Sequence, residues 1–312
     1  MIIRRRGHVA TITIQHPPAN ALSTQVLEDL SACLDELSER QDVRSVVIHG
    51  EGRFFSAGAD IKEFTSLMDG SDYANLADKG QQIFEKVESF PKPVIAAIHG
   101  ATLGGGLELA MACHIRIAEE SAKLGLPELN LGIIPGFAGT QRLPKYVGTA
   151  KALEMIGTSE PISGKEAFEY GLVTILAANE EEVLQKAKEL AQKFAEKSPQ
   201  TMAYVIELLN SSKVYSYEGG LKLEGKYFGE VFQSEDAKEG IQAFLEKRKR
   251  ILKGNNKREN KGDEQNMNIY VLMKRTFDTE EKIQIEQGEI NTDGAEFIIN
   301  PYDEYAIEEA LQ

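Results

Sequence analysis

A glycine-rich turn followed by a glutamate is the segment of the sequence best suited to chemistry. The glycines at 104–106 separate an apolar run from Leu107 and Glu108, a pattern that predicts a strand, a tight turn and the start of a helix. Free backbone N–H groups at a helix N-terminus stabilise negative charge, and glycines let a ligand approach that backbone closely. The spacing matches neither a phosphate-binding P-loop nor a GxGxxG dinucleotide motif. The segment therefore predicts either an anion site beside a carboxylate or, more plainly, a tight helix contact beside a solvent-exposed glutamate.

Three segments of the chain carry its most specific motifs. They read FSAGADIKE at residues 55–63, GGGLELA at 104–110 and PELNLGIIPGFAGTQRLP at 127–144. None of them would be specific alone, but together they resemble the crotonase (enoyl-CoA hydratase/isomerase) family, and the resemblance extends from about residue 3 to residue 250. It implies an α/β fold built as a spiral of β-β-α units with a helical C-terminal part. It also implies a thioester of coenzyme A as the substrate.

The resemblance implies an oxyanion hole formed by two backbone N–H groups. By motif position these belong to Ala59 and Gly105, and they would hold the oxygen of the thioester carbonyl. When water adds to the β-carbon of a 2-enoyl thioester, negative charge develops on that oxygen as an enolate. Preorganised backbone donors stabilise this charge, and the loss of one donor typically costs about 3 kcal/mol.

The resemblance also implies a pair of catalytic glutamates, Glu108 and Glu128. In hydratases of this family one glutamate lies two residues beyond the glycine triplet, and the other follows a proline about twenty residues later. We expect Glu108 to orient and activate the water and Glu128 to supply the proton to the α-carbon. Two carboxylates can divide these roles when their environments separate their pKa values. Taken alone, Glu128 would be interpreted as a surface carboxylate in a loop.

With both glutamates present, the resemblance favours an enoyl-CoA hydratase, a hydro-lyase of fatty-acid β-oxidation. An enoyl-CoA isomerase, or another acyl-CoA enzyme of the same family, is one alternative. A non-catalytic CoA-binding adaptor is the alternative from another functional class. No cofactor is expected, because coenzyme A is part of the substrate. No metal is expected either, because the sequence has no His/Cys/carboxylate cluster at metal-ligand spacing.

The resemblance implies contacts with coenzyme A in two separate parts of the chain. One is the loop of the first motif, and the other is a C-terminal helix that in this family covers the CoA, commonly that of a neighbouring subunit. The expected contact residues are Ala57, Ala59, Asp60, Ile61, Lys62, Phe244 and Lys247. Lys62 could equally be an exposed helix lysine, and the basic run at 247–250 could equally be a solvated helix end.

Phe137 and Ala138 depart from the family pattern. In many members a small residue and a glycine follow the Pro-Gly that stands here at 135–136. We expect the extra bulk of Phe137 to shorten or reshape the acyl pocket.

Short apolar runs alternate with helical patterns through the first two-thirds of the chain. Strands are predicted at 9–14, 46–48, 94–98 and 114–118, and helices at 24–37 after the capping residue Ser23, at 81–90, after the glycine triplet and at 180–197. Further helix is predicted to about residue 249. This alternation favours an α/β fold. We expect a core of residues 1–190 and a C-terminal helical part of residues 191–254, to which the resemblance assigns trimerisation.

The composition excludes several other classes of protein. A formal net charge of −14 argues against a general nucleic-acid binder, whose phosphate contacts need a basic surface. No apolar stretch is long enough for a membrane-spanning helix, and residues 9–14 are too short and too polar for a secretory signal. Cys33 and Cys113 form neither a disulfide framework nor a CxxC motif. We expect a cytoplasmic protein whose partners are its acyl-CoA substrate and copies of itself, as a trimer or a dimer of trimers.

Residues 255–312 differ from the rest of the chain in composition. They carry 6 Lys/Arg and 14 Asp/Glu, a net charge of −8, against −6 for residues 1–254. The polar, aperiodic stretch 255–266 is predicted to be a linker. Residues 267–312, with short predicted strands at 269–273 and 282–286, resemble the opening of the electron-transfer flavoprotein β-subunit. Since only this fragment is present, we expect no flavin or AMP site and no association with that flavoprotein; an acidic interaction tail is the alternative.

Overall fold

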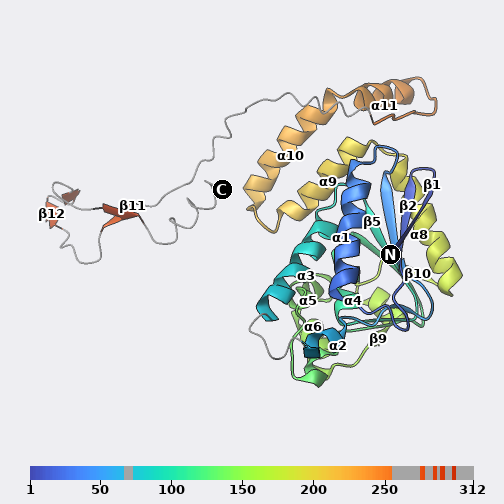
Figure 1. Ribbon diagram of the computed structural model, residues 1–312. Helices are drawn as coiled ribbons and strands as arrows, with labels where there is room; N and C mark the ends of the chain where they lie inside the picture. Colours follow the sequence, from blue (N-terminus) through green and yellow to red (C-terminus); the bar gives the residue numbers. More distant parts are fainter. Residues whose placement is uncertain (67–72, 255–274, 278–283, 287–288, 292–296, 300–312) are drawn as a thin grey trace. The chain divides into compact units, whose positions relative to one another are not determined.

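The computed structural model describes residues 1–66 and 73–254 and, beyond them, four short strands at 275–277, 284–286, 289–291 and 297–299 (Figure 1). Its internal contacts divide the chain into two units, residues 1–255 and 256–312. The expected linker at 255–266 and the expected strand at 269–273 lie outside the described residues. None of the described helices is both long and apolar enough to cross a membrane.

A six-stranded sheet forms the centre of the first unit. Its strand order is β1-β2-β3-β5-β7-β10, with β1 antiparallel to β2 and the other neighbours parallel. The strands are β1 (Ile2–Arg6), β2 (Val9–Ile14), β3 (Ser45–Gly50), β5 (Val94–Ile98), β7 (Ile115–Glu119) and β10 (Ile175–Ala177). Along β5 the residues belong alternately to two apolar clusters, one on each face of the sheet. Burial on both faces explains why β5 is continuously apolar in sequence.

A second, four-stranded sheet contains the strands that directly follow β3, β5 and β7 in the chain, together with one further strand. Its order is β4 (Phe54–Ser56), β6 (Ala101–Leu103), β8 (Lys123–Gly125) and β9 (Ile162–Ser163). The chain passes from β3 to β4, from β5 to β6 and from β7 to β8, so each pair of consecutive strands is divided between the two sheets. A helix follows each pair. This alternation is the β-β-α spiral that the sequence predicted.

Long amphipathic helices cover both faces of the first sheet. On one face lie α1 (Thr24–Glu39), whose N-cap Ser23 accepts a hydrogen bond from the N–H of Val26, and α3 (Tyr73–Glu88). On the other face lies α8 (Glu180–Ala195), which buries Val183, Ala187, Ala191 and Ala195. Residue 190, where we expected the core to end, falls inside α8. The whole length of this helix packs against the sheet, so the core extends to the end of α8.

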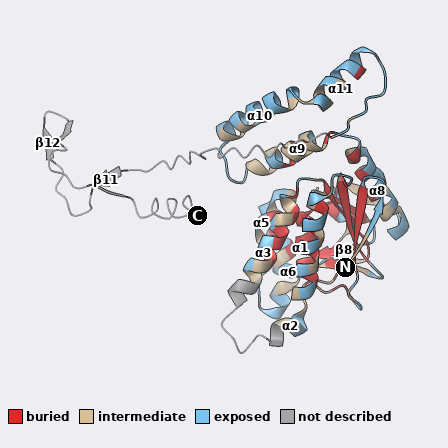
Figure 2. Cartoon of the chain, turned by 45° about the horizontal axis from the view of Figure 1, so that its top comes forward, coloured by how far each residue is buried: buried red, intermediate tan, exposed pale blue. Residues whose placement is uncertain are grey.

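Shorter helices connect the repeats, and three helices complete the unit. The connecting elements are α2 (Ile61–Ser66), α4 (Gly105–Ala112), the 3₁₀ helix η1 (Glu128–Leu131), α5 (Gly139–Val147), α6 (Thr149–Thr158) and α7 (Gly164–Glu169). The C-terminal helices are α9 (Pro199–Ser211), α10 (Tyr217–Phe232) and α11 (Glu235–Leu245). Figure 2 shows that α10 and α11 are largely exposed, whereas central sheet strands such as β2 and β5 are buried.

Arg44 fastens the C-terminal end of the first unit to its sheet. Its guanidinium donates to the carbonyl of Ala195 at 3.2 Å, to that of Leu252 at 3.1 Å and to that of Lys253 at 2.9 Å. The N–H of Gly254 donates to the Asp236 carboxylate at 3.1 Å. The segment after α11 is therefore tied to both the sheet and the last helix.

In the second unit the described strands form two antiparallel pairs. β11 (Arg275–Phe277) pairs with β14 (Phe297–Ile299), and β12 (Gln284–Glu286) pairs with β13 (Glu289–Asn291). β12 falls within the strand predicted at 282–286.

Candidate active site

The glycine turn between β6 and α4 exposes a backbone donor. Gly104 has φ +52°, a left-handed conformation that glycine adopts without a Cβ penalty, and its N–H donates to Gly125 in the neighbouring strand. Gly105 is the first residue of α4, so its N–H has no acceptor within the helix. No other acceptor for it lies in the described part of the chain. This N–H is thus available to an oxygen atom at the helix N-terminus.

Ala59 presents a second donor beside the first. Leu22 bridges to this segment by donating to the Gly58 carbonyl at 2.8 Å and accepting from the Asp60 N–H at 3.3 Å. In such a parallel bridge the middle residue directs its own N–H away from its partner strand. The Ala59 nitrogen lies only 3.4 Å from where a Cβ on Gly105 would stand. The two residues expected to form an oxyanion hole are therefore adjacent.

Glu108 lies in the first turn of α4 and is 1% exposed. Its Oε1 accepts two backbone hydrogen bonds, from Phe137 at 2.8 Å and from Gly139 at 2.7 Å. Burial raises the pKa of Glu108 to about 7, against the lowering effect of these N–H donors and with a further rise from the charge of Glu128. The solvent-exposed glutamate that the sequence left open as an alternative is excluded.

Glu128 begins η1 and lies over the glycine turn. A Cβ on Gly104 would stand 3.1 Å from Oε1 of Glu128. Its Oε2 is buried and has no hydrogen-bond partner among the described residues. Burial raises the pKa of Glu128 above its ordinary value. A buried carboxyl oxygen without a partner is costly, and this cost is relieved when a ligand or a proton acceptor faces it.

Phe137 fills the space between α3 and α4. Its ring is 4% exposed and packs edge-to-face on Phe84 with the ring centroids 5.3 Å apart. A Cβ on Gly80 would come within 2.2 Å of this ring, so only glycine fits at that position of α3. The ring also lies 3.2 Å from where a Cβ on Gly105 would stand, which places the bulk of Phe137 directly beside the oxyanion-hole donor.

Arg142 was not assigned a role from the sequence, although it belongs to the third motif. It is 3% exposed, and its Nη1 donates to the Phe137 carbonyl at 3.0 Å. Its Nε donates to Glu88 at 2.9 Å and its Nη2 to Glu85 at 2.8 Å. Arg142 is the only basic residue of the third motif, which is a local signal, but its partners on α3 are 54 and 57 residues away in sequence.

The residues expected to contact coenzyme A near the first motif form one continuous segment with Ala59. Ala57 donates to Ala19, and the Asp60 carboxylate accepts from the N–H of Lys62 at 3.0 Å, which fixes the start of α2. Ile61 is 46% exposed. Ala57, Ala59, Asp60, Ile61 and Lys62 are therefore brought together at the oxyanion-hole loop.

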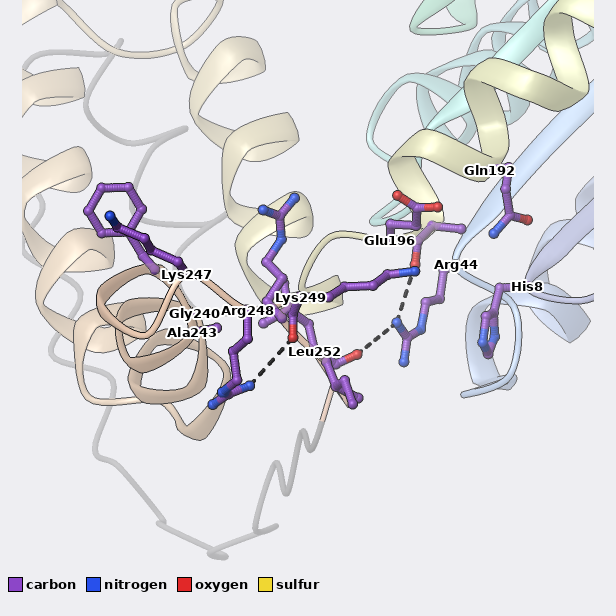
Figure 3. Close-up of a pocket in the computed structure, with 14 residues that line it drawn as sticks. His8, Arg44, Gln192, Glu196, Gly240, Ala243, Lys247, Arg248, Lys249 and Leu252 are labelled. Carbon is purple, nitrogen blue, oxygen red and sulfur yellow. Dashed lines mark hydrogen bonds between the residues drawn. The ribbon is translucent and has the colours of Figure 1, made fainter.

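Phe244 and Lys247 lie elsewhere in the same unit. Both line a cavity of about 710 Å³ bounded by the end of α8, by Arg44 and by the basic run at 247–250 (Figure 3). None of the residues that line this cavity belongs to the group around Glu108. Phe244 is 81% exposed. Within a single chain the structure does not bring these two residues to the glycine turn.

Comparisons with known proteins bear on the family and the fold of the chain. A family model described as enoyl-CoA hydratase/isomerase matches residues 4–255. A Bacillus subtilis protein named "Probable enoyl-CoA hydratase" is 74% identical over 246 residues, which cover 79% of this chain and 95% of the relative. A Clostridium acetobutylicum protein named "Short-chain-enoyl-CoA hydratase" is 38% identical, with 80% of this chain and 95% of the relative covered. The crystal structure of an enoyl-CoA hydratase from Bacillus anthracis has a TM-score of 0.77 at 39% identity, covering 81% of this chain and 98% of that one. The resemblance and the fold predicted from the sequence are confirmed.

Proposed function

The chain belongs to the enoyl-CoA hydratase/isomerase family, and we propose that it is an enoyl-CoA hydratase. As a hydro-lyase it adds water reversibly to a 2-enoyl-CoA and gives the 3-hydroxyacyl-CoA. The observation that carries the proposal is the convergence of the buried Glu108 and the half-buried Glu128 on a pair of adjacent backbone donors. The relatives named as hydratases support the same activity.

The proposed reaction begins with the thioester oxygen between the N–H groups of Ala59 and Gly105. These donors polarise the conjugated system and stabilise the enolate that forms. Glu108, as the carboxylate, takes a proton from water while the water oxygen bonds to the β-carbon. Glu128, as the carboxylic acid, gives its proton to the α-carbon. A proton transfer from Glu108 back to Glu128 then resets the pair.

Their different surroundings support this division of roles. Two backbone donors stabilise the ionised form of Glu108, whereas Glu128 has a buried Oε2 without such donors. The two carboxyl groups also repel each other, since the charge of Glu128 raises the pKa of Glu108. The two carboxyl groups therefore titrate as a coupled pair, and the proposed reaction starts from the state in which Glu108 is ionised and Glu128 holds the proton.

Hydration of crotonyl-CoA tests the proposal directly, because the ultraviolet absorbance of the conjugated thioester disappears as water adds. We expect the purified full chain to be active. Glu128→Gln preserves size but removes the proton donor, so kcat should fall by about two to four decades, as is typical of general acid–base catalysis. Near-native hydration by Glu128→Gln contradicts the assignment, and a wild-type chain that binds the thioester without turnover supports the adaptor alternative.

We further propose a trimer, or a dimer of trimers, in which Phe244 and Lys247 of one copy contact the coenzyme A bound by another. The exposed apolar side chains of α10 and α11, such as Phe228 at 65% and Leu245 at 69%, support an interface there. We place the enzyme in the cytoplasm and in fatty-acid β-oxidation. Light scattering after size exclusion tests the assembly, and a monomer with full activity contradicts it.

A further inference from the structure

A backbone turn positions Glu108, and neighbouring side chains fix the shape of that turn. The turn consists of residues 137–139, and its two N–H groups fix Oε1 of Glu108. Ala138 at its centre has φ +68°, a conformation that alanine adopts only at a cost. A strained turn keeps its shape only when neighbouring groups hold it. The groups that do so here include Gln81, which donates to the Gly136 carbonyl at 2.9 Å, and the buried guanidinium of Arg142.

All three nitrogen atoms of the Arg142 guanidinium donate hydrogen bonds. Nη1 donates to the carbonyl of Phe137, the residue whose own N–H donates to Glu108. Nε and Nη2 bind Glu88 and Glu85 on α3. Lys213, which follows α9, completes the cluster with Nζ 2.6 Å from the other Glu88 oxygen. The turn is therefore connected through one arginine to the charged side of α3.

We propose that Arg142 is a positioning residue for the hydration reaction: it fixes the 137–139 turn so that Glu108 stands aligned with the water it activates, and it provides a buried positive charge facing that carboxylate. The proposal rests on the proposed function, because it concerns the role of Glu108 in hydration. Arg142 itself touches neither Glu108 nor the oxyanion-hole donors through a hydrogen bond. It acts through the backbone and through charge.

The direction in which the loss of Arg142 shifts the protonation of Glu108 can be worked out from the surrounding charges. The charges that act on Glu108 are Glu128 from η1, which raises its pKa, and Arg142 from α5, which lowers it. Facing Arg142 are Glu85 and Glu88 from α3 and Lys213 after α9. Removing Arg142 withdraws the positive charge, loosens the two N–H donors and leaves the glutamates of α3 less neutralised. All three changes favour protonated Glu108, so a reaction that needs its carboxylate should lose its rate at a higher pH than before.

The experiment compares four full-length variants with crotonyl-CoA as the probe: Arg142→Met, Arg142→Lys, Glu108→Gln and the double variant Arg142→Met/Glu108→Gln. Arg142→Met should lower kcat by about ten- to a hundredfold, with KM changed less than about threefold, because alignment is lost rather than thioester binding. The acidic limb of its pH–kcat profile should move to higher pH. Arg142→Lys keeps the charge but not the fork of donors, so its kcat should fall while its limb moves less.

The double variant separates positioning from general damage to the fold. If Arg142 acts through Glu108, adding Arg142→Met to Glu108→Gln should cost less than about threefold more, because the two losses are not additive. Lys86→Met is the matched control, since Lys86 also makes an ion pair from α3 but pairs with Asp35 on α1; its kcat should stay within about twofold of the wild type.

Two results overturn the proposal: an unshifted acidic limb in Arg142→Met, or full additivity with Glu108→Gln. Should Arg142→Met fail to fold, Arg142→Lys decides by its kcat and by its additivity with Glu108→Gln in the matching double variant: an unchanged kcat or full additivity overturns the proposal. A wild-type chain without hydratase activity is a different outcome, because it refutes the proposed function before any variant is compared.

Discussion

At the scale of single residues, the role proposed for Glu108 conflicts with the stability of the folded chain at neutral pH. Burial raises its pKa to about 7, so in the folded chain it binds its proton more tightly than a glutamate in the unfolded chain, which titrates near 4.5. The folded state is therefore favoured by this group at low pH. That contribution is lost as the pH rises from about 4.5 to about 7, because the unfolded chain ionises first.

Glu108→Gln should accordingly be more stable than the wild type above pH 7. The variant keeps the acceptor oxygen for Phe137 and Gly139 but never has to bury a charge. One pKa unit corresponds to about 1.4 kcal/mol, so a shift from 4.5 to about 7 sets an upper bound of roughly 3–4 kcal/mol for the gain in the free energy of unfolding. Denaturant unfolding at pH 5 and pH 8 measures it, and the gain should be small at pH 5. A variant that is less stable than the wild type at pH 8 contradicts this account.

The two proposed catalytic glutamates could be located from the sequence, whereas the residues that hold them could not. Glu108 and Glu128 lie within short motifs that are continuous in the chain, so the family resemblance of those motifs was sufficient to propose them. Arg142 lies in such a motif too, but its function depends on Glu85 and Glu88, more than fifty residues away, and on the carbonyl of Phe137. Contacts of this kind depend on how α3 packs beside α5, which no local pattern contains.

At the scale of elements, the N–H group of Gly105 at the N-terminus of α4 leads to a testable prediction. Proline is tolerated at the first position of a helix but has no N–H. Gly105→Pro should therefore abolish turnover, while Gly105→Ala, which keeps the N–H but pushes on the Phe137 ring, should lose less. Initial rates with crotonyl-CoA measure both, and circular dichroism confirms folding. A folded and active Gly105→Pro variant would falsify the assignment of this donor.

The N-terminus of α5 predicts a gain in stability. Ala138 caps this helix with φ +68°. A left-handed alanine costs about 1–2 kcal/mol, partly offset by the extra entropy that glycine loses on folding, so Ala138→Gly should raise the free energy of unfolding by about 0.5–1 kcal/mol. Thermal and denaturant midpoints should both increase. Unchanged or lower midpoints would show that the turn is held without strain.

Which elements the sequence predicted correctly depended on their length. Strands β2 and β5 and helices α1 and α8 were predicted because their apolar patterns extend over five residues or more. The second-sheet strands β4, β6 and β8 span three residues each and were missed, since three residues establish no period. Helix α3 begins at Tyr73, eight residues before the predicted start at Gln81, and Gly80, a poor helix former, interrupts the helical pattern between them.

At the scale of the whole molecule, the boundary at residue 254 predicts which part of the chain is dispensable. Contacts separate residues 1–255 from 256–312, and the proposed catalytic residues all belong to the first unit. A chain that stops after Gly254 should keep its kcat/KM and its thermal midpoint. Activity assays and differential scanning calorimetry on the truncated and full chains measure both, and loss of activity or of assembly contradicts the prediction.

A chain that stops after Arg250 provides the control. It lacks the carbonyls of Leu252 and Lys253 that Arg44 binds and the N–H of Gly254 that Asp236 binds. Hydrogen bonds to charged groups contribute about 1.5–3 kcal/mol each, so this shorter chain should unfold at a clearly lower temperature. Equal midpoints for the two truncations would mean that these contacts are not stabilising.

Arg44 also brings together the two ends of the C-terminal helical segment. One guanidinium binds the chain where it leaves the sheet layers, at Ala195, and again where it returns, at Leu252 and Lys253. The intervening residues 196–251 therefore start and end at the same place in the fold. A segment of this kind can be lengthened, shortened or exchanged without changing the path of the chain on either side of it. A recombinant graft between residues 196 and 251 would leave the register of both sheets intact, and it would need to keep Lys213 beside Glu88 and the proposed coenzyme A contacts of Phe244 and Lys247.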